Sequence, residues 1–259
     1  MSRGNFDVKI RPMKKTKTEF KDFFFKRIIN KRNFTYRNLL ECLDSYLEKG
    51  NRVLDAGCGE GNLSMYMART GSFVSGIDMS TKSIGKCRRK AANLGLERMT
   101  SFRSANIEKD RINGTFNLIL CFEVLEHIKD YGLVIKRFSE LLKPNGTLII
   151  STPSLNAPLY KIGLIKKKDK LLGHLRRYTE EDLVNLCKSE GLRIIETMKR
   201  EGILRNFLFY NHLGILPLKL ANRFWIISDV FTFFDNITLR LFGESQIIVV
   251  AQKPGKEKE

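Results

Sequence analysis

Two carboxylates flank a glycine-rich turn, and their spacing is typical of a nucleoside site. Asp55 precedes Gly57, Gly59 and Gly61, and Asp78 follows at the end of the next apolar run. Glycines let the backbone turn tightly and approach a ligand, because no Cβ stands in the way. A carboxylate at the end of the second strand can accept hydrogen bonds from both hydroxyls of a ribose. The pattern therefore predicts a nucleoside cofactor rather than a bare structural turn.

A second group of reactive side chains, Glu123, Glu126 and His127, directly follows the apolar run 116–121. Their i, i+3, i+4 spacing would place all three on one face of a helix. Two interpretations follow from these residues alone. They are polar residues that orient the loop, or His127 is the general base for a hydroxyl nucleophile.

These side chains require a scaffold of alternating strands and helices. Apolar runs predict strands at 53–56, 73–77, 99–103, 116–121, 147–151, 192–197 and 245–252. Helical spacing and caps predict helices at 34–49, 63–69, 81–93, 133–142 and 180–189. Ser80 and Thr179 are the predicted N-caps of two of these helices. Such alternation indicates an α/β fold, with a parallel sheet that carries helices on both faces.

Several ordered motifs resemble those of the class I S-adenosylmethionine-dependent methyltransferases, in particular the ubiquinone-biosynthesis and small-molecule branch. The motifs are V-L-D-A-G-C-G-E-G-N at 53–62, G-I-D-M-S at 76–80, A-N-I at 105–107, F-N-L-I-L-C-F-E-V-L-E-H-I at 116–128 and L-K-P-N-G-T-L-I-I-S-T-P at 142–153. The resemblance implies a Rossmann-like, doubly wound sheet of seven strands whose last strand, here 245–252, is antiparallel.

The same resemblance implies which residues contact S-adenosylmethionine. They are Asp55, Gly57, Cys58 and Gly59 beside the methionine part, Asp78 at the ribose, Asn106 and Ile107 at the adenine, and Phe122 near the sulfonium, with Met79 and Arg37 as further contacts. The sulfonium already activates the methyl group, so the protein has to align the nucleophile, the methyl group and the sulfur. A strong general base is then optional.

The E-x-x-E-H sequence also resembles the divalent-ion cluster of ubiquinone-biosynthesis O-methyltransferases and of small-RNA 2′-O-methyltransferases. This resemblance implies a third interpretation, in which Glu123, Glu126 and His127, together with His174, bind Mg²⁺. Such an ion would lower the pKa of an attacking hydroxyl. Oxygen is therefore the expected methyl acceptor.

Charge and aromatic residues gather in segments that cover the active site in this fold. Residues 1–37 carry a net charge of +9 and residues 161–177 a net charge of +6, out of +18 for the chain. Residues 202–242 hold nine aromatic residues and are expected to form two or three helices. A basic rim beside an apolar lid predicts a lipid-like or hydrophobic substrate at an anionic membrane surface. RNA is the alternative substrate, and a non-catalytic partner subunit that binds S-adenosylmethionine is the alternative class.

Length and composition limit the remaining possibilities. The 259 residues suit one α/β domain at 34–259, with a substrate-covering insertion at 202–242 and a basic arm at 1–33. The segment 152–177 is expected to be a long loop. Five cysteines without a C-x-x-C pair favour a reducing compartment. With no apolar leader and no apolar run of about 20 residues, the expected location is cytoplasmic, with peripheral membrane contact.

Overall fold

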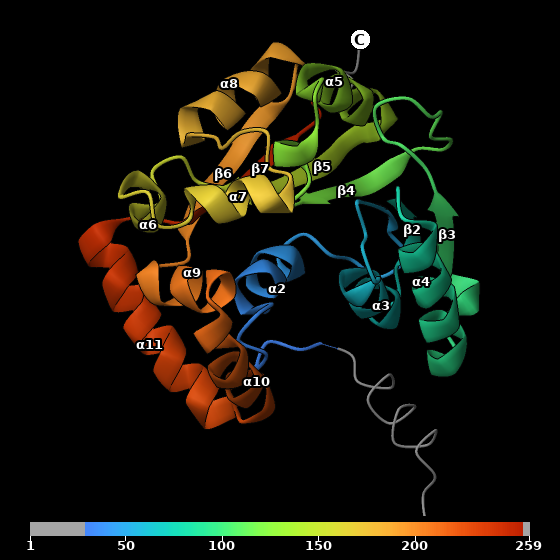
Figure 1. The fold of residues 1–259 in the computed structure, drawn as a ribbon. Helices are drawn as coiled ribbons and strands as arrows, with labels where there is room; N and C mark the ends of the chain where they lie inside the picture. The colour runs from blue at the N-terminus through green and yellow to red at the C-terminus, as the bar shows by residue number, and fades with distance from the viewer. Residues whose placement is uncertain (1–28, 256–259) are drawn as a thin grey trace, which may run out of the picture.

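The computed structural model describes residues 29–255; residues 1–28, most of the predicted basic arm, and residues 256–259 lie outside the described part. A seven-stranded sheet forms the centre, with strand order β3-β2-β1-β4-β5-β7-β6 (Figure 1). The strands are β1 (Arg52–Ala56), β2 (Phe73–Asp78), β3 (Thr100–Ser104), β4 (Phe116–Phe122), β5 (Leu142–Pro153), β6 (Arg193–Arg200) and β7 (Gln246–Gln252). β7 pairs antiparallel with both β5 and β6, as predicted, whereas β1 to β5 pair in parallel.

Helices cover both faces of the sheet. On one face α5 (Tyr131–Leu141) and α8 (Glu180–Ser189) bury Phe138 and Leu183, and on the other α2 (Arg37–Asp44) and α3 (Asn62–Arg69) bury Leu40 and Met67. Successive strand residues alternate between the two cores: Val53 belongs to one and Leu54 to the other. This period of two is what a sheet buried on both sides requires.

The predicted caps of two helices are confirmed. Ser80 accepts a hydrogen bond from the Ser83 N–H at 3.2 Å and begins α4 (Thr81–Leu94). Thr179 begins α8 with a capping box, in which its side chain and that of Asp182 each accept the other's backbone N–H. Each cap satisfies an N–H group that the helix cannot bond internally.

Two predicted segments need correction. The expected loop 152–177 contains α6 (Pro158–Lys161) and α7 (Lys166–Leu172), because the buried Asp169 in α7 pairs with the Arg177 guanidinium and anchors a helix whose sequence lacks an apolar period. The expected helix 34–49 is α-helical only over Arg37–Asp44. At its C-terminal end the hydrogen bonds join residues three apart instead of four, from Ser45 N–H to Cys42 O and from Tyr46 N–H to Leu43 O.

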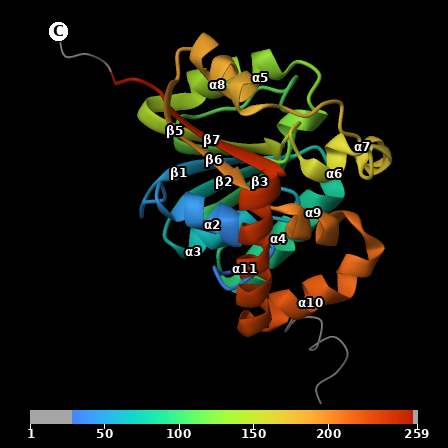
Figure 2. The ribbon, with the colours of Figure 1, turned by 90° about the vertical axis from the view of Figure 1, so that its left-hand side faces the viewer.

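The segment 202–242 forms three α-helices, which we call the cap: α9 (Ile203–Tyr210), α10 (Ile215–Arg223) and α11 (Trp225–Phe242). The cap lies beside α2, at the edge of the sheet that carries β6 and β7 (Figures 1 and 2). Arg205 and Asp235, both fully or almost fully buried, form an ion pair inside the cap at 3.3 Å. Arg205 also donates to the Phe34 carbonyl, and the Phe34 and Phe231 rings meet edge to face. These contacts bind the cap to the segment that precedes α2.

Candidate active site

Asp78 shapes the glycine-rich turn between β1 and α3. One carboxylate oxygen accepts the Gly59 N–H at 2.9 Å, and the other accepts the Ser80 N–H at 2.8 Å. Gly57 has a φ of 78°, and a Cβ there would lie 2.2 Å from Cγ2 of Val124. Only glycine fits this position, because the conformation is left-handed and the loop after β4, which contains Val124, passes directly over it.

The turn borders a crevice of about 420 Å³. Five predicted cofactor residues line it: Asp55, Gly57, Cys58, Gly59 and Phe122, together with Glu123 of the second motif. At Gly59, φ is 52° and a Cβ would meet no atom within 4 Å, so this face of the turn opens onto free space. A turn that exposes its backbone to an open crevice fits a nucleoside cofactor held close to the main chain.

Asp55 lies at the bottom of this crevice and is only 4% exposed. Its carboxylate accepts a hydrogen bond from Ser64 Oγ at 2.5 Å. Burial raises the pKa of Asp55 to about 6, against the effect of the Ser64 bond. A cationic ligand group beside Asp55 would favour the ionised carboxylate.

The other predicted cofactor residues lie around the crevice or beyond it. Ile107 is buried in the core, and the Asn106 side chain accepts the Glu108 N–H at 2.8 Å in the turn after β3. Met79 is 67% exposed beside Asp78. Arg37 faces α11 instead, where its guanidinium pairs with Asp229 at 2.6 Å and donates to Thr232. On the α2 side, Tyr36 and Leu39 form the wall of the crevice and Arg37 does not line it. The position of Arg37 therefore does not support its predicted contact with the cofactor.

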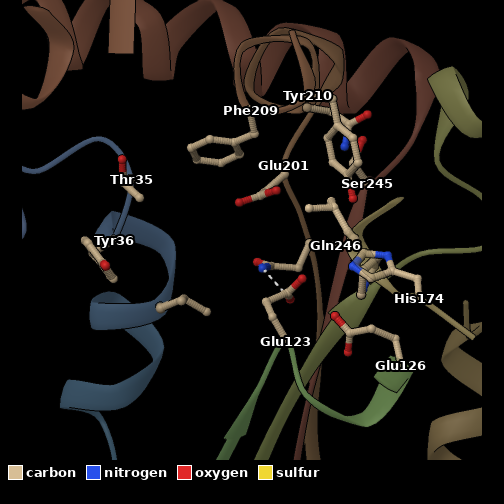
Figure 3. Close-up of a pocket in the computed structure, with 14 residues that line it drawn as sticks. Thr35, Tyr36, Glu123, Glu126, His174, Glu201, Phe209, Tyr210, Ser245 and Gln246 are labelled. Atoms are coloured by element: carbon tan, nitrogen blue, oxygen red, sulfur yellow. Dashed lines mark hydrogen bonds between the residues drawn. The ribbon is translucent and has the colours of Figure 1, made fainter. Parts of the chain in front are cut away.

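A second cavity, of about 330 Å³, shares Tyr36, Leu39 and Glu123 with the crevice. It lies between α2, the cap and the ends of β4 and β7 (Figure 3). Its wall is formed by Thr35, Tyr36, Leu39, Glu123, Glu126, Pro153, Leu172, His174, Glu201, Asn206, Phe209, Tyr210, Ser245 and Gln246. Because the two spaces share walls, a molecule in the cavity would lie next to the cofactor.

The expectation that Glu123, Glu126 and His127 share one helical face is wrong. Glu123 has a φ of 53°, and only Leu125–His127 forms a short 3-10 helix. Glu123 therefore lies outside this helix, and its carboxylate is held by side chains of β5 and β7. It accepts hydrogen bonds from Ser151 Oγ at 2.9 Å and from Gln246 Nε2 at 3.0 Å (Figure 3).

Glu126, His127 and His174 do converge, and one ligand atom of each lies within 4.8 Å of the others. Glu126 is fully buried, yet neither carboxylate oxygen has a hydrogen-bond partner within residues 29–255. Burial, and then the neighbouring Glu123, raise the pKa of Glu126 well above its usual range. An orphaned buried carboxylate of this kind fits a missing cation, because a cation would compensate its charge.

The two histidines are suited to donate electron pairs. His127 Nδ1 lies 3.2 Å from the Gly173 carbonyl and can donate to it, which leaves Nε2 free. Burial lowers the pKa of His127 and favours the neutral ring. His174 Nδ1 lies 3.4 Å from Asp169 Oδ1, and the two imidazole rings meet edge to face. Neutral imidazoles are required both of a general base and of a metal ligand.

Sequence reasoning missed Glu201, which lines the second cavity from the end of β6. Its φ is 61°, an uncommon left-handed conformation for a residue with a side chain. Burial raises its pKa to about 8. A glutamate directly before Gly202 is the only local sign in the sequence, and it does not reveal that the side chain faces a cavity.

Residues 47–201 match the protein family described as "Methyltransferase domain". Two curated relatives are ubiquinone biosynthesis O-methyltransferases. The one from Paracidovorax citrulli is 32% identical over 163 residues, which is 59% of this chain and 68% of the relative. The one from Actinobacillus pleuropneumoniae (serotype 5b) is 36% identical over 195 residues, which is 70% of this chain and 76% of the relative.

Solved structures share the fold. A geranyl diphosphate C-methyltransferase from Streptomyces coelicolor superposes with a TM-score of 0.61 at 16% identity, over 83% of this chain and 77% of that one. An S-adenosylmethionine-dependent methyltransferase from Mesorhizobium loti gives 0.58 at 18% identity, over 84% and 97%. The fold, the glycine-rich crevice and these matches define a methyltransferase. The chain belongs to the class I S-adenosylmethionine-dependent methyltransferases, and its cofactor is S-adenosylmethionine.

Proposed function

We propose that this enzyme transfers the methyl group of S-adenosylmethionine to an oxygen atom of a hydrophobic or lipid-like small molecule near an anionic membrane surface. The observation that carries the proposal is the convergence of Glu126, His127 and His174 beside a cavity that adjoins the cofactor crevice. The hydroxyl oxygens of a methyl acceptor could approach these side chains while the acceptor faces the cofactor. The name of the curated relatives, which are O-methyltransferases, is consistent with this acceptor atom.

The walls of the cavity favour an apolar, uncharged acceptor. Leu39, Leu172, Phe209 and Tyr210 supply apolar surface, and Glu201 adds a carboxyl group. Among the described residues the wall contains three glutamates and neither lysine nor arginine. A phosphate group would meet no lysine or arginine side chain of this wall, which weighs against the RNA alternative.

The residues present fit Mg²⁺, although His174 and His127 are softer ligands than this ion prefers. Glu126 would hold the ion through its unpartnered oxygens, with His127 and His174 beside it. When bound, the ion would lower the pKa of the acceptor hydroxyl. Glu123 would contribute by positioning, because Ser151 and Gln246 already hold its carboxylate.

The protein's main contribution would be alignment. Asp78 and the glycine-rich turn would hold the cofactor from one side, and Tyr36, Leu39 and Glu123 line both the crevice and the acceptor cavity. Holding the two reactants in line can supply roughly 7–11 kcal/mol at the upper end. Without a bound ion, Nε2 of His127 would be free to take the hydroxyl proton.

The test is transfer of labelled methyl groups to 4-alkylcatechols, which offer adjacent hydroxyl oxygens and an apolar tail. We expect turnover to rise with the length of the alkyl chain, and Glu126→Gln to lower kcat by about 100-fold. The exposed Glu140→Gln in α5 is the matched control and should leave kcat unchanged. Undiminished turnover in chelator would refute the metal, and methylation of RNA but not of catechols would refute the hydrophobic acceptor.

A further inference from the structure

The outward face of α11 carries apolar side chains that a surface helix normally buries. Ile226, Val230, Phe233, Ile237 and Leu241 follow one another at helical spacing, and each is between 38% and 69% exposed. Together they form a continuous stripe along four turns of the helix. Figure 1 places α11 at the outer edge of the molecule (Figure 1).

The inward face of α11 makes both apolar and polar contacts: Ile227 and Phe231 pack against a small buried cluster of α9 and α10. Ser228 and Asp235 are the residues of this helix that are buried, and Asp235 pairs with Arg205 of α9. Asp235 also accepts the backbone N–H groups of Gly202 and Arg205 at 3.1 and 2.7 Å. The inward contacts thus already hold the helix in place, and the apolar stripe on its outward face is a second apolar surface, which is the arrangement expected of a helix with an apolar environment outside.

The apolar surface continues onto α10 and the turn between the two helices. We define the outer cap face as the exposed residues Leu213, Leu216, Leu220, Phe224, Trp225, Ile226, Val230, Phe233, Phe234, Ile237 and Leu241. A surface of this extent on the described part of the chain exceeds the scattered apolar residues of ordinary protein surfaces.

Positive charge borders this face. Lys219 and Arg223 project from the exposed side of α10, and residues 202–228 contain no acidic residue. The first acid that follows, Asp229, is paired with Arg37. Arg32 lies 5.9 Å from the Trp225 ring, so the aromatic turn is flanked by a cation as well. Apolar and aromatic side chains bordered by Lys and Arg are typical of helices that lie in the interface of an anionic membrane.

We propose that the outer cap face docks onto an anionic lipid bilayer, with α10 and α11 lying in its interface. Within residues 29–255, no helix is long and apolar enough to cross a bilayer, so the contact would be peripheral. The bordering cations select this occupant, since they complement acidic headgroups while the apolar stripe enters the acyl region. This inference deepens the proposed function and rests on it for the identity of the substrate.

Docking in this orientation would bring the acceptor cavity close to the lipid. α9 packs against α10 and α11 through Leu204 and Leu208. The same helix supplies Phe209 and Tyr210 to the wall of the acceptor cavity (Figure 3). One helix thus separates the proposed membrane contact from the cavity, and an apolar acceptor would leave the bilayer beside its binding site.

Trp225 makes the test direct, because it is the only tryptophan in the sequence and belongs to the outer cap face. We would record the fluorescence of the full chain with vesicles of phosphatidylglycerol and phosphatidylcholine, and with pure phosphatidylcholine vesicles. With the acidic vesicles at low salt we expect a blue shift of Trp225 emission and its quenching by lipids brominated on the acyl chains. The neutral vesicles should produce a clearly smaller effect.

The triple variant Phe233→Ser/Phe234→Ser/Ile237→Ser should bind acidic vesicles at least about 10-fold more weakly, because it removes apolar surface from the contact. Phe73→Ser is the matched control, since Phe73 is 51% exposed at the start of β2, outside the cap. It should leave vesicle binding unchanged. Unaltered affinity for S-adenosylmethionine would show that both variants are folded.

Three results would overturn docking through this face. The first is absence of vesicle binding by the full chain. The second is binding that survives the triple variant but is lost on deletion of residues 1–28. The third is self-association of the chain that the triple variant abolishes, without any vesicle binding, because a second copy would then cover the face. Turnover of short-chain catechols in the absence of vesicles tests the proposed function separately: its loss would refute that function and leave a measured docking intact.

Discussion

The sheet and the cap place their apolar residues in opposite ways. In the sheet domain, strand residues alternate between two buried cores, and large side chains such as Phe138 are inaccessible to solvent. In the cap, α11 exposes Phe233 and Phe234 while the ion pair of Arg205 and Asp235 lies inside. A buried ion pair contributes little net stability, because desolvation offsets the attraction between the charges, but losing one partner is costly. The sheet region thus buries its large apolar side chains on both faces, whereas the cap buries an ion pair and leaves a row of large apolar side chains exposed.

The largest expected effect compares phenylalanines of the two regions. Phe138→Ala should lower the free energy of unfolding by about 3–5 kcal/mol, since it leaves a cavity in the core under α5. Phe234→Ala should change it by no more than about 0.5 kcal/mol, since Phe234 is 53% exposed. Urea unfolding of both variants measures the difference. Equal losses would mean that the outer cap face is covered in the free protein, and the contrast between the two regions would be lost.

The next effect concerns the crevice, which belongs to the sheet region. Asp78→Ala should weaken S-adenosylmethionine binding by about 1.5–3 kcal/mol, through loss of a charged hydrogen-bond acceptor that also holds the Gly59 N–H. Glu140→Ala removes an exposed carboxylate of α5, and it should leave the affinity unchanged. Isothermal titration separates the two. An equal loss in both would indicate a general effect of charge rather than a ribose contact.

The third effect depends on pH and lies where the two regions meet, at Glu201. Because its folded pKa of about 8 exceeds the ordinary value of 4.5, the folded protein holds a proton that the unfolded chain releases between those pH values. Stability from this group is therefore present below pH 4.5 and is lost as the pH rises, by about 1.4 kcal/mol per pH unit over that window. Glu201→Gln should abolish this slope, so the variant should be the more stable protein at pH 8 and about equal at pH 4.5.

Urea unfolding at several pH values measures the slope. Glu140→Gln, at an exposed position of α5, should reproduce the pH dependence of the unsubstituted protein. Parallel curves for Glu201→Gln and the unsubstituted protein would show that the Glu201 carboxyl reaches solvent, and the boundary between cap and sheet would then be open.

Local patterns predicted the sheet region well. The run 116–121 and the caps Ser80 and Thr179 lie within a few residues of the elements observed, because apolar periodicity and cap bonds are local properties of the chain. Local patterns did not reveal α7, because this helix is stabilised by the contact of Asp169 with Arg177, which lies outside it, rather than by an apolar period of its own. The position of Glu123 was missed because a left-handed φ at this residue interrupts the helical spacing, and because its partners Ser151 and Gln246 lie far from it in the sequence.

The sequence alone determined the succession of strands and helices along the chain, the glycine-rich turn and the carboxylate at Asp78, since each depends on residues close together along the chain. The tertiary structure alone decided that Glu123 lies outside the short helix of Glu126 and His127, that Glu201 faces the cavity, and that α11 points its apolar stripe outward. Helical periodicity shows that an apolar stripe exists but not which way it faces. Its direction follows from the contact of Arg205 with Asp235, two residues that lie thirty positions apart in the sequence.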